Sequence, residues 1–444
     1  MQEQDTLRLL CSRPAAYLIF LIFSWLIAGC TEPCEGTYTY TVYEPVYQTR
    51  AELAAAIQSE PAKALRKTGK IYAVDQYILV NELNEGIHVI DNSNPRNPQN
   101  IGFIAIPGNV DMAVRSNVLY ADAGTDLLVL DITIPKAIKV IKHLENVFQP
   151  ASLMAANGAF INADPSKGIV VAYKERLVTE QRSCDEMIPN RRPVAWWEWN
   201  SANPNSNFVS NDAGKANSGG ATGKAGSMAR FTLYGNFLYT VGPSQMQVFN
   251  VANPTNPQKG EPVYLGGGIE TIFPYQNKLF IGSNAGMLIY SLANPAAPTH
   301  IGGYSHLRAC DPVVVEGNYA YVTLRTNPNS FCGGNANQLD VVDISNAALP
   351  QVRKTYPMQN PHGLGIDKST LFICEGNYGL KVFNAANPDA IADNLLAHKK
   401  DLHAFDVIPL GKNLLVIGED GFRQYDYSNP KSLQFLSKIP VSPN

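Results

Sequence analysis

The chain has 444 residues, of which 45% are hydrophobic and 16% are charged, with 34 glycines and 30 prolines. This length and hydrophobic content suffice for a large buried core, and the many glycines and prolines are typical of a β-rich protein with many turns. The formal net charge is −3 and no basic stripe occurs along the sequence, which argues against nucleic acid as a partner.

The N-terminal segment has the pattern of an export signal. Arg8 and Arg13 precede an apolar stretch that is shorter than a membrane span requires. The stretch ends in "LIAGC", which resembles the lipobox of bacterial lipoproteins, where the cysteine is lipidated and becomes the new N-terminus. We therefore predict that residues 1–29 are a lipoprotein signal peptide and that Cys30 carries the lipid anchor. An ordinary signal peptide with a chance cysteine is the alternative.

Residues 30–67 are predicted to form a lipidated tether with one strand and one helix. Tyrosine alternates with other residues in "TYTYTVYEPVYQT" at residues 37–49, as expected of a strand. The segment "AELAAAIQ" at residues 51–58 is rich in helix-forming residues and predicts one short helix.

One phrase returns along the rest of the chain. It is written "GIHVIDNSNPRNPQNIGF" at residues 86–103 and comes back as "DLLVLDITIP", "MQVFNVANPTNP", "MLIYSLANPAAP", "LDVVDISNAALP", "GLKVFNAANP" and "FRQYDYSNP". In each copy an apolar run leads to a polar residue that opens a turn. These turn residues are Asp91, Asp131, Asn250, Ser291, Asp343, Asn384 and Asp426. An Asp or Asn side chain accepts a backbone N–H two residues on, and a following proline ends the strand, so the chain must reverse there.

The spacing of the copies predicts the fold. Successive copies are separated by about 40 to 51 residues, except for 119 between the second and the third. Units of roughly 40 residues with four short strands are typical of β-propeller blades. We predict an all-β, seven-bladed β-propeller of four-stranded blades over residues 68–444, with residues 148–228 inserted between the second and third blades. An eight-bladed ring is the alternative, if residues 148–180 fold as a divergent blade.

The wording of the repeat, in "HVIDNSNP" and "VVDISN", resembles the LVIVD-repeat family of bacterial exported β-propeller lipoproteins. The resemblance covers residues 70–443 apart from the insertion, and it implies the fold. It implies almost nothing about chemistry, because the blades define the family.

Both irregular segments are expected at one face of the propeller. The innermost strand of each blade starts at this face, and the loop between the second and third strands returns to it. The insertion 148–228 leaves from a fourth strand, and the ten extra residues of the fifth blade in "TLRTNPNSFCGGNANQ" lie between its second and third strands. We call this the decorated face and the opposite one, which holds the repeated turns, the Asn-Pro face.

Four cysteines of the predicted propeller also map to the decorated face, and disulfides are permitted in an exported protein. We favour a Cys310–Cys332 disulfide, since both residues belong to one blade edge, with Cys184–Cys374 as the complementary pair. Buried free thiols are the alternative. The cysteine spacings match no zinc motif.

The insertion and the central channel hold the candidate binding residues. Trp196, Trp197 and Trp199 in "VAWWEWN" suit recognition of sugars or partner proteins, although they could instead pack the insertion onto the propeller. Residues expected to ring the channel entrance are Asp111, Arg230, Glu270, Asp311, His362, His403 and Asp406. No cofactor is predicted, although such groups would fit a small ligand or a metal such as calcium; the alternative is that they only bind water.

No catalytic motif is present: the chain lacks G-x-S-x-G, H-E-x-x-H and a Gly-rich phosphate loop. No catalytic residue is therefore assigned, and the expected function is a non-catalytic protein-interaction platform. We expect a bacterial cell-envelope lipoprotein tethered to the outer membrane, with another envelope protein or an extracellular glycan as partner. The alternatives are a small-ligand or glycan-binding propeller and a metal-dependent hydrolase that uses the channel.

Overall fold

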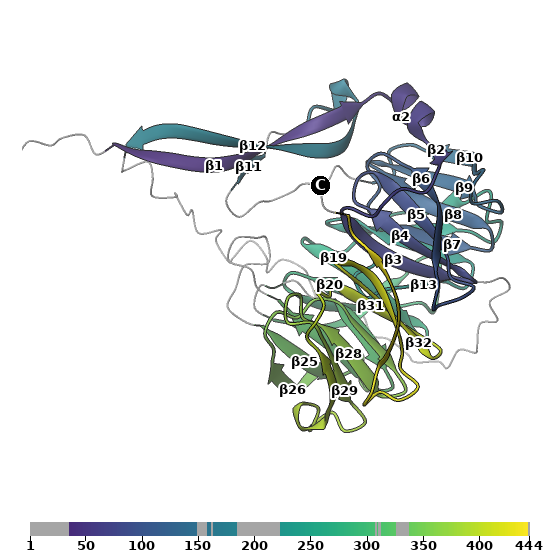
Figure 1. Cartoon of the computed structure of the whole chain (residues 1–444). Helices are drawn as coiled ribbons and strands as arrows, with labels where there is room; N and C mark the ends of the chain where they lie inside the picture. Colours follow the sequence, from purple (N-terminus) through teal and green to yellow (C-terminus); the bar gives the residue numbers. More distant parts are fainter. Residues whose placement is uncertain are drawn as a thin grey trace, which may run out of the picture. The chain divides into compact units, whose positions relative to one another are not determined.

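The computed structural model describes residues 35–148, 158–160, 163–183, 223–306, 309, 312–325 and 337–442. The chain divides into two compact units, one of residues 1–40 and 177–207 and the other of residues 41–176 and 208–444. The second unit contains the repeats (Figure 1). No described helix has the length and hydropathy needed to cross a bilayer.

The repeats form antiparallel sheets of the β-propeller type. Among the described residues, the first blade consists of β3 (Thr68–Val74), β4 (Tyr77–Glu82), β5 (Gly86–Asp91) and β6 (Gln99–Ala105), and the second of β7 (Met112–Arg115), β8 (Val118–Ala123), β9 (Asp126–Asp131) and β10 (Lys139–Leu144). The third blade consists of β14 (Phe231–Tyr234), β15 (Phe237–Val241), β16 (Gln245–Asn250) and β17 (Gln258–Lys259), with β18 (Val263–Tyr264) also paired with β16, and the fourth of β19 (Ile269–Tyr275), β20 (Lys278–Ser283), β21 (Gly286–Ser291) and β22 (Thr299–Ser305). The fifth blade consists of β23 (Val313–Glu316), β24 (Tyr319–Leu324), β25 (Gln338–Asp343) and β26 (Gln351–Pro357), the sixth of β27 (Leu364–Asp367), β28 (Thr370–Cys374), β29 (Leu380–Asn384) and β30 (Leu395–Lys399), and the last of β31 (Asp406–Leu410), β32 (Asn413–Gly418), β33 (Gly421–Asp426) and β34 (Gln434–Pro440).

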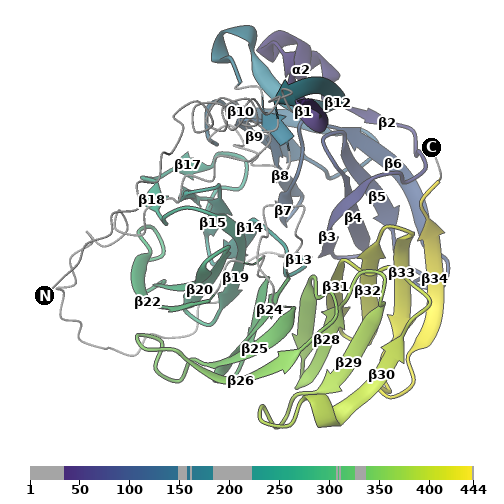
Figure 2. The same ribbon diagram turned by 90° about the vertical axis from the view of Figure 1, so that its left-hand side faces the viewer.

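The sheets follow one another around a centre. The innermost strands contact each other in the order β3, β7, β14, β19, β23, β27 and β31, and β3 also contacts β32 of the last sheet. Figure 2 looks onto this arrangement, with the inner strands grouped around a central strand, β13 (Lys224–Ala225). Middle strands are buried on both faces, so their sequences are continuous apolar runs.

The repeated turns of the Asn-Pro face have the predicted chemistry. In all seven copies the side chain of the turn residue accepts a hydrogen bond from the backbone N–H two residues on, at 2.8–3.1 Å. At Asp91, for example, Oδ1 accepts from the amide of Ser93 at 2.9 Å. The recurring phrase is therefore the turn that closes each blade.

The same turns also join neighbouring blades. The hydroxyl of Tyr239 donates to the carbonyl oxygen of Pro295 at 2.7 Å, and Tyr120 donates to Pro254 in the same way at 2.8 Å. The ring is closed by a similar contact, since Ser437 Oγ donates to the carbonyl of Pro95 at 2.7 Å. The uniformity of this face thus has a structural reason.

The segment before the repeats forms the expected strand and helix. The strand is β1 (Glu35–Gln48), and the helix is α2 (Arg50–Ala56), where Thr49 and Glu52 form a capping box. The helix ends two residues before the expected Gln58, because β2 (Gln58–Glu60) begins there and pairs with β6.

The segment considered as an eighth blade forms a different sheet. β12 (Ile169–Ser183) and β11 (Gly158–Phe160) both pair with β1 in a three-stranded sheet. The 3-10 helix η1 (Pro165–Lys167) lies between β11 and β12 in the chain. A second 3-10 helix, η3 (Ala392–Asn394), precedes β30. Among the described residues, the blade-type sheets therefore correspond to the seven copies of the phrase.

Candidate functional site

The end of the predicted insertion lies in the centre of the propeller. β13 pairs antiparallel with the inner strand β3, with Lys224 opposite Ala73 and Ala225 opposite Tyr72. The ammonium group of Lys224 donates to the carbonyl oxygen of Pro409 at 2.8 Å. We call residues 223–230 the channel plug. Because β13 is antiparallel to β3, the plug runs toward the decorated face.

A turn of the plug is held by a buried carboxylate. Asp406 Oδ1 accepts hydrogen bonds from the backbone N–H and the hydroxyl of Ser227, at 3.3 and 3.1 Å. Ser227 Oγ in turn accepts from the amide of Leu364 at 2.8 Å. Burial raises the pKa of Asp406 to about 6, although hydrogen bonds from Val407 and Ser227 oppose the rise.

Asp111, another predicted channel residue, holds the other end of the plug together with Lys70. Lys70 Nζ lies 3.1 Å from Asp111 Oδ2, which also accepts a hydrogen bond from the backbone N–H of Arg230. Lys70 donates in addition to the carbonyl of Met228. Asp111 and Arg230, both expected at the channel entrance, are therefore in contact, and this contact fixes the plug. The sequence reasoning missed the plug because nothing in residues 223–230 indicates which strand they pair with.

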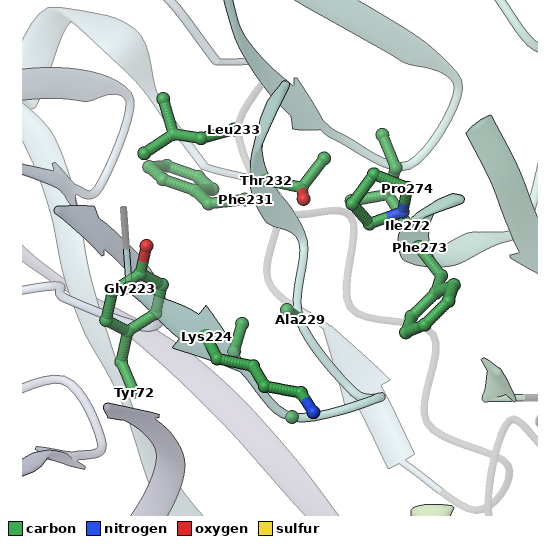
Figure 3. Close-up of a pocket in the computed structure, with 12 residues that line it drawn as sticks. Tyr72, Gly223, Lys224, Ala229, Phe231, Thr232, Leu233, Ile272, Phe273 and Pro274 are labelled. Atoms are coloured by element: carbon green, nitrogen blue, oxygen red, sulfur yellow. The ribbon is translucent and has the colours of Figure 1, made fainter. Parts of the chain in front are cut away.

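A small cavity of about 160 Å³ lies beside the plug, as Figure 3 shows. It is lined by Tyr72 and Lys224 together with apolar side chains of β14 and β19, including Phe231 and Ile272. The Tyr72 hydroxyl donates to Val114 O at 3.3 Å. This volume is below the range of about 300–1,000 Å³ that small-molecule sites usually have.

A larger cavity of about 570 Å³ opens on the decorated face. We call it the basic cavity, and its lining residues are Arg66, Lys67, Thr68, Leu83, Arg325, Asn360, His362, His403, Phe405 and Glu419. They come from the first, fifth, sixth and seventh blades and their preceding loops. Three side chains of this lining are cationic and one is anionic, so the cavity carries a positive field.

Two histidines and a phenylalanine form one wall of the basic cavity. The ring centroids of His362 and His403 lie 5.4 and 4.4 Å from that of Phe405. Burial, followed by the charges of Arg325 and His403, lowers the pKa of His362 to about 3. His362 is therefore neutral at physiological pH. His403 Nε2 lies 3.5 Å from a carboxylate oxygen of the exposed Glu419.

The remaining predicted site residues are distributed as follows. Glu270 lies in β19. Burial lowers the pKa of Arg325, and the charge of Glu270 opposes this in part. Cys374 is a fully buried free thiol, so the structure does not contain the suggested Cys184–Cys374 disulfide. The predicted residues that lie outside the described part of the chain are Cys30, Cys184, Trp196, Trp197, Trp199, Cys310, Asp311 and Cys332. The part of the chain that the structure describes has no group of three His, Cys, Asp or Glu residues arranged to hold a metal.

The sequence reasoning also missed the cations of the basic cavity. Arg66 and Lys67 stand just before the first blade, and Arg325 stands where the fifth-blade insertion begins. Their positions in the sequence could have indicated this, since all three residues lie next to strand ends that meet the decorated face.

Comparison with known proteins supports the repeat assignment. The LVIVD repeat model matches residues 308–328 and 330–357, which confirms the repeat that "VVDISN" indicates. No curated protein matches the sequence. Among solved structures, the computationally designed Ika8 protein is similar with a TM-score of 0.46 and 8% identity, over 87% of this chain and 94% of its own.

Two natural proteins are similar to the same degree. Kluyveromyces lactis Hsv2 has a TM-score of 0.45 and 11% identity, over 84% of this chain and 100% of its own. A functionally unknown protein from Desulfotomaculum acetoxidans has a TM-score of 0.43 and 11% identity, over 84% and 95%. The fold assignment rests on the strand pairing of the chain itself.

Proposed function

We propose that this chain is an exported lipoprotein, anchored by Cys30 to the outer membrane, whose propeller is a non-catalytic platform for binding another envelope protein or glycan. The observation that carries the proposal is the contrast between the two faces. On the Asn-Pro face, the side chain of every repeated turn is engaged in blade closure. The two long departures from the repeat, residues 148–228 and the fifth-blade insertion, leave from the decorated face. Loops that exceed structural need are where binding concentrates.

The filled channel also favours a platform over a hydrolase with a channel metal. The carboxylates of Asp111 and Asp406, which such an ion would need, accept hydrogen bonds from the plug. An ion entering there would have to displace Ser227 and the amide of Arg230, each of which would then lose its buried partner.

A capture experiment tests the platform. Residues 184–222, which include the three tryptophans, are replaced by a Gly-Ser segment of equal length, and the variant is compared with the parent in crosslinking to envelope proteins and glycans. We expect the crosslinked products of the parent to disappear. A matched control, Arg96→Ala with Lys136→Ala, removes two charges from the Asn-Pro face and should leave the products unchanged. Retention of all products by the Gly-Ser variant would refute the assignment of the binding face.

Membrane anchoring is tested separately with Cys30→Ser. In the lipobox interpretation the lipid is attached to the sulfur of Cys30, so the variant should accumulate as an unprocessed precursor or be released from membranes. Membrane-bound protein of normal mature mass would show that the lipobox interpretation is wrong.

A further inference from the structure

The structure points to a ligand site on the decorated face that is separate from the tryptophan-containing segment. We propose that the basic cavity binds a small anionic molecule that carries carboxylate or phosphate groups. This inference does not rest on the proposed platform function, and either can fail without the other.

The first argument is that the cations Arg66 and Lys67, which line the basic cavity, are exposed and have no ion-pair partner among the described residues. Some other exposed cations are paired, as Arg353 is with Asp389 at 2.6 Å and Lys63 with Glu85 at 3.1 Å, whereas Arg96 and Lys136 on the Asn-Pro face have no ion pair with a described residue. Arg66 and Lys67 differ from those two in being adjacent and in lining a cavity. Two adjacent unmatched cations at the mouth of a cavity attract an anion.

The second argument is that the backbone carrying these cations is fixed. The buried carboxylate of Glu82 accepts hydrogen bonds from the amides of Arg66, at 3.0 Å, and of Lys67. His88 Nε2 lies 2.9 Å from the same carboxylate. Burial by itself would raise the pKa of Glu82, but the hydrogen bonds from His88 and the two amides outweigh it and lower the pKa. Glu82 is therefore ionised, and its carboxylate is occupied by the two amides and His88 within the wall.

Residues near the C-terminal end of the chain also hold the segment that carries Arg66 and Lys67. The amide of Ser442 donates to the carbonyl of Leu65 at 2.8 Å, and Leu65 forms a bridge with Val441. Leu65 is itself fully buried. The backbone of Arg66 and Lys67 is thus already ordered before a ligand binds. Binding therefore costs less conformational entropy there, which favours affinity.

The opposite wall supplies polar groups of the right kind. Arg325 is a permanent cation whose charge is opposed in part by Glu270, and Asn360 and the neutral His362 lie in the same lining. A Cβ at Gly376 would come within 2.6 Å of Asn360 Nδ2 and 3.1 Å of His362 Nε2, so glycine at this position keeps both side chains in place. Arginine, amide and imidazole N–H groups are the donors that carboxylate and phosphate oxygens accept from.

Size and composition exclude other ligand classes. A volume of about 570 Å³ lies within the range of small-molecule sites. Cations would be repelled by the excess of positive charge. A largely apolar ligand would find only Leu83 and Phe405 as apolar partners in the lining.

The test is a calorimetric titration of the full chain in detergent at low salt, after passage of protein and buffer over a chelating resin so that metal chelation cannot contribute. The probes are citrate, glucose 6-phosphate and, as the uncharged match, glucose. We expect citrate or glucose 6-phosphate to bind saturably at one site and glucose not to bind. Which of the two binds more tightly tells a carboxylate site from a phosphate site.

Variants locate the site. Arg66→Ala with Lys67→Ala should weaken binding of the anion about tenfold or more, since it removes two charge-assisted contacts. Lys67→Glu changes the local charge by the same two units while keeping a polar side chain, and should weaken binding to a similar degree. The control pair Arg96→Ala with Lys136→Ala should change the affinity less than about twofold. Absence of saturable binding of both anions, or equal weakening by the two double variants, would overturn the proposal.

Discussion

Asp406 and Ser227 are 179 positions apart in the chain, and the hydroxyl of Ser227 donates to Asp406 Oδ1 at 3.1 Å. Asp406 begins the inner strand of the last blade, whereas Ser227 belongs to the segment that precedes the third blade. The contact makes the end of an insertion part of the propeller core. It also places a buried carboxylate where its ionisation affects the stability of the plug.

The first prediction concerns the pH dependence of stability. The pKa of Asp406 is about 6 in the folded protein against 3.8 for the free side chain, so between these values the folded state holds a proton that the unfolded state has lost. The free energy of unfolding should therefore fall as pH rises from about 4 to about 6, by at most about 3 kcal/mol from this residue. Asp406→Asn should remove this part of the fall.

The measurement is urea unfolding of parent and variant at matched pH values from 4 to 7. Burial also raises the pKa of Asp122, to about 7, so only the difference between the two proteins is interpreted. Parallel curves for the parent and Asp406→Asn would show that Asp406 ionises normally.

A second prediction tests how tightly the plug fits. A Cβ at Gly226 would collide with the carboxylate of Asp406, whereas a Cβ at Gly267 would meet nothing within 4 Å. Gly226→Ala should therefore lower the free energy of unfolding by about 1–3 kcal/mol, as overpacking of a filled interior does. Gly267→Ala serves as the control and should stay within about 0.5 kcal/mol. Equal effects of the two changes would mean that the plug can move aside.

The blades could be predicted from the sequence because their signals are local. An apolar run followed by Asp91 or Asp343 and a turn determines where a strand ends, and the side chain and the amide that it binds are two residues apart. The spacing between copies then predicted seven units. The resemblance to LVIVD repeats, which the match at residues 330–357 confirms, rests on the same local pattern.

The site could be predicted only in part, because its contacts are not local. Asp111 and Asp406 were expected at the channel entrance, and they do lie at starts of inner strands. Nothing in the sequence indicated that the carboxylate of Asp406 would bind Ser227 or that the carboxylate of Asp111 would bind Lys70. The polar residues of the channel therefore looked available for a ligand, whereas in the fold they bind a segment of the chain itself.

A third prediction concerns the contacts between blades. Tyr239 is fully buried and its hydroxyl donates to Pro295 O, so Tyr239→Phe leaves that carbonyl without this donor. The expected loss is about 1 kcal/mol of unfolding free energy, measured by urea denaturation. Tyr264, whose side chain is 77% exposed, is the control, and Tyr264→Phe should have no measurable effect. A neutral Tyr239→Phe would show that the latch between blades contributes nothing net.

The fourth prediction concerns the cysteines. Burial raises the pKa of the Cys374 thiol well above its usual value, and the side chain is fully buried. Cys374 should therefore resist alkylation in the native protein and react after unfolding.

Cys310 and Cys332 should appear as one linked peptide in non-reducing mass mapping. Their disulfide would raise the free energy of unfolding by about 3 kcal/mol in the chain-entropy model. Two free thiols at these positions in exported protein would rule out that pair, and a Cys184–Cys374 peptide would contradict the buried free thiol.

The last prediction separates the structural part of the insertion from the rest. A Gly-Ser replacement of residues 184–222 keeps β13, the Lys224–Pro409 contact and the chain length, so the length-dependent cost of closing the loop does not change. This variant should unfold at the same urea concentration as the parent. Extending the replacement through residue 226 removes the pairing of β13 with β3 and the hydrogen bond of Lys224, and should cost on the order of 1–3 kcal/mol. If both variants are as stable as the parent, the plug does not stabilise the propeller. If instead the shorter replacement is already destabilising, residues 184–222 contribute to the fold, and a loss of partner capture in that variant could no longer be assigned to binding alone.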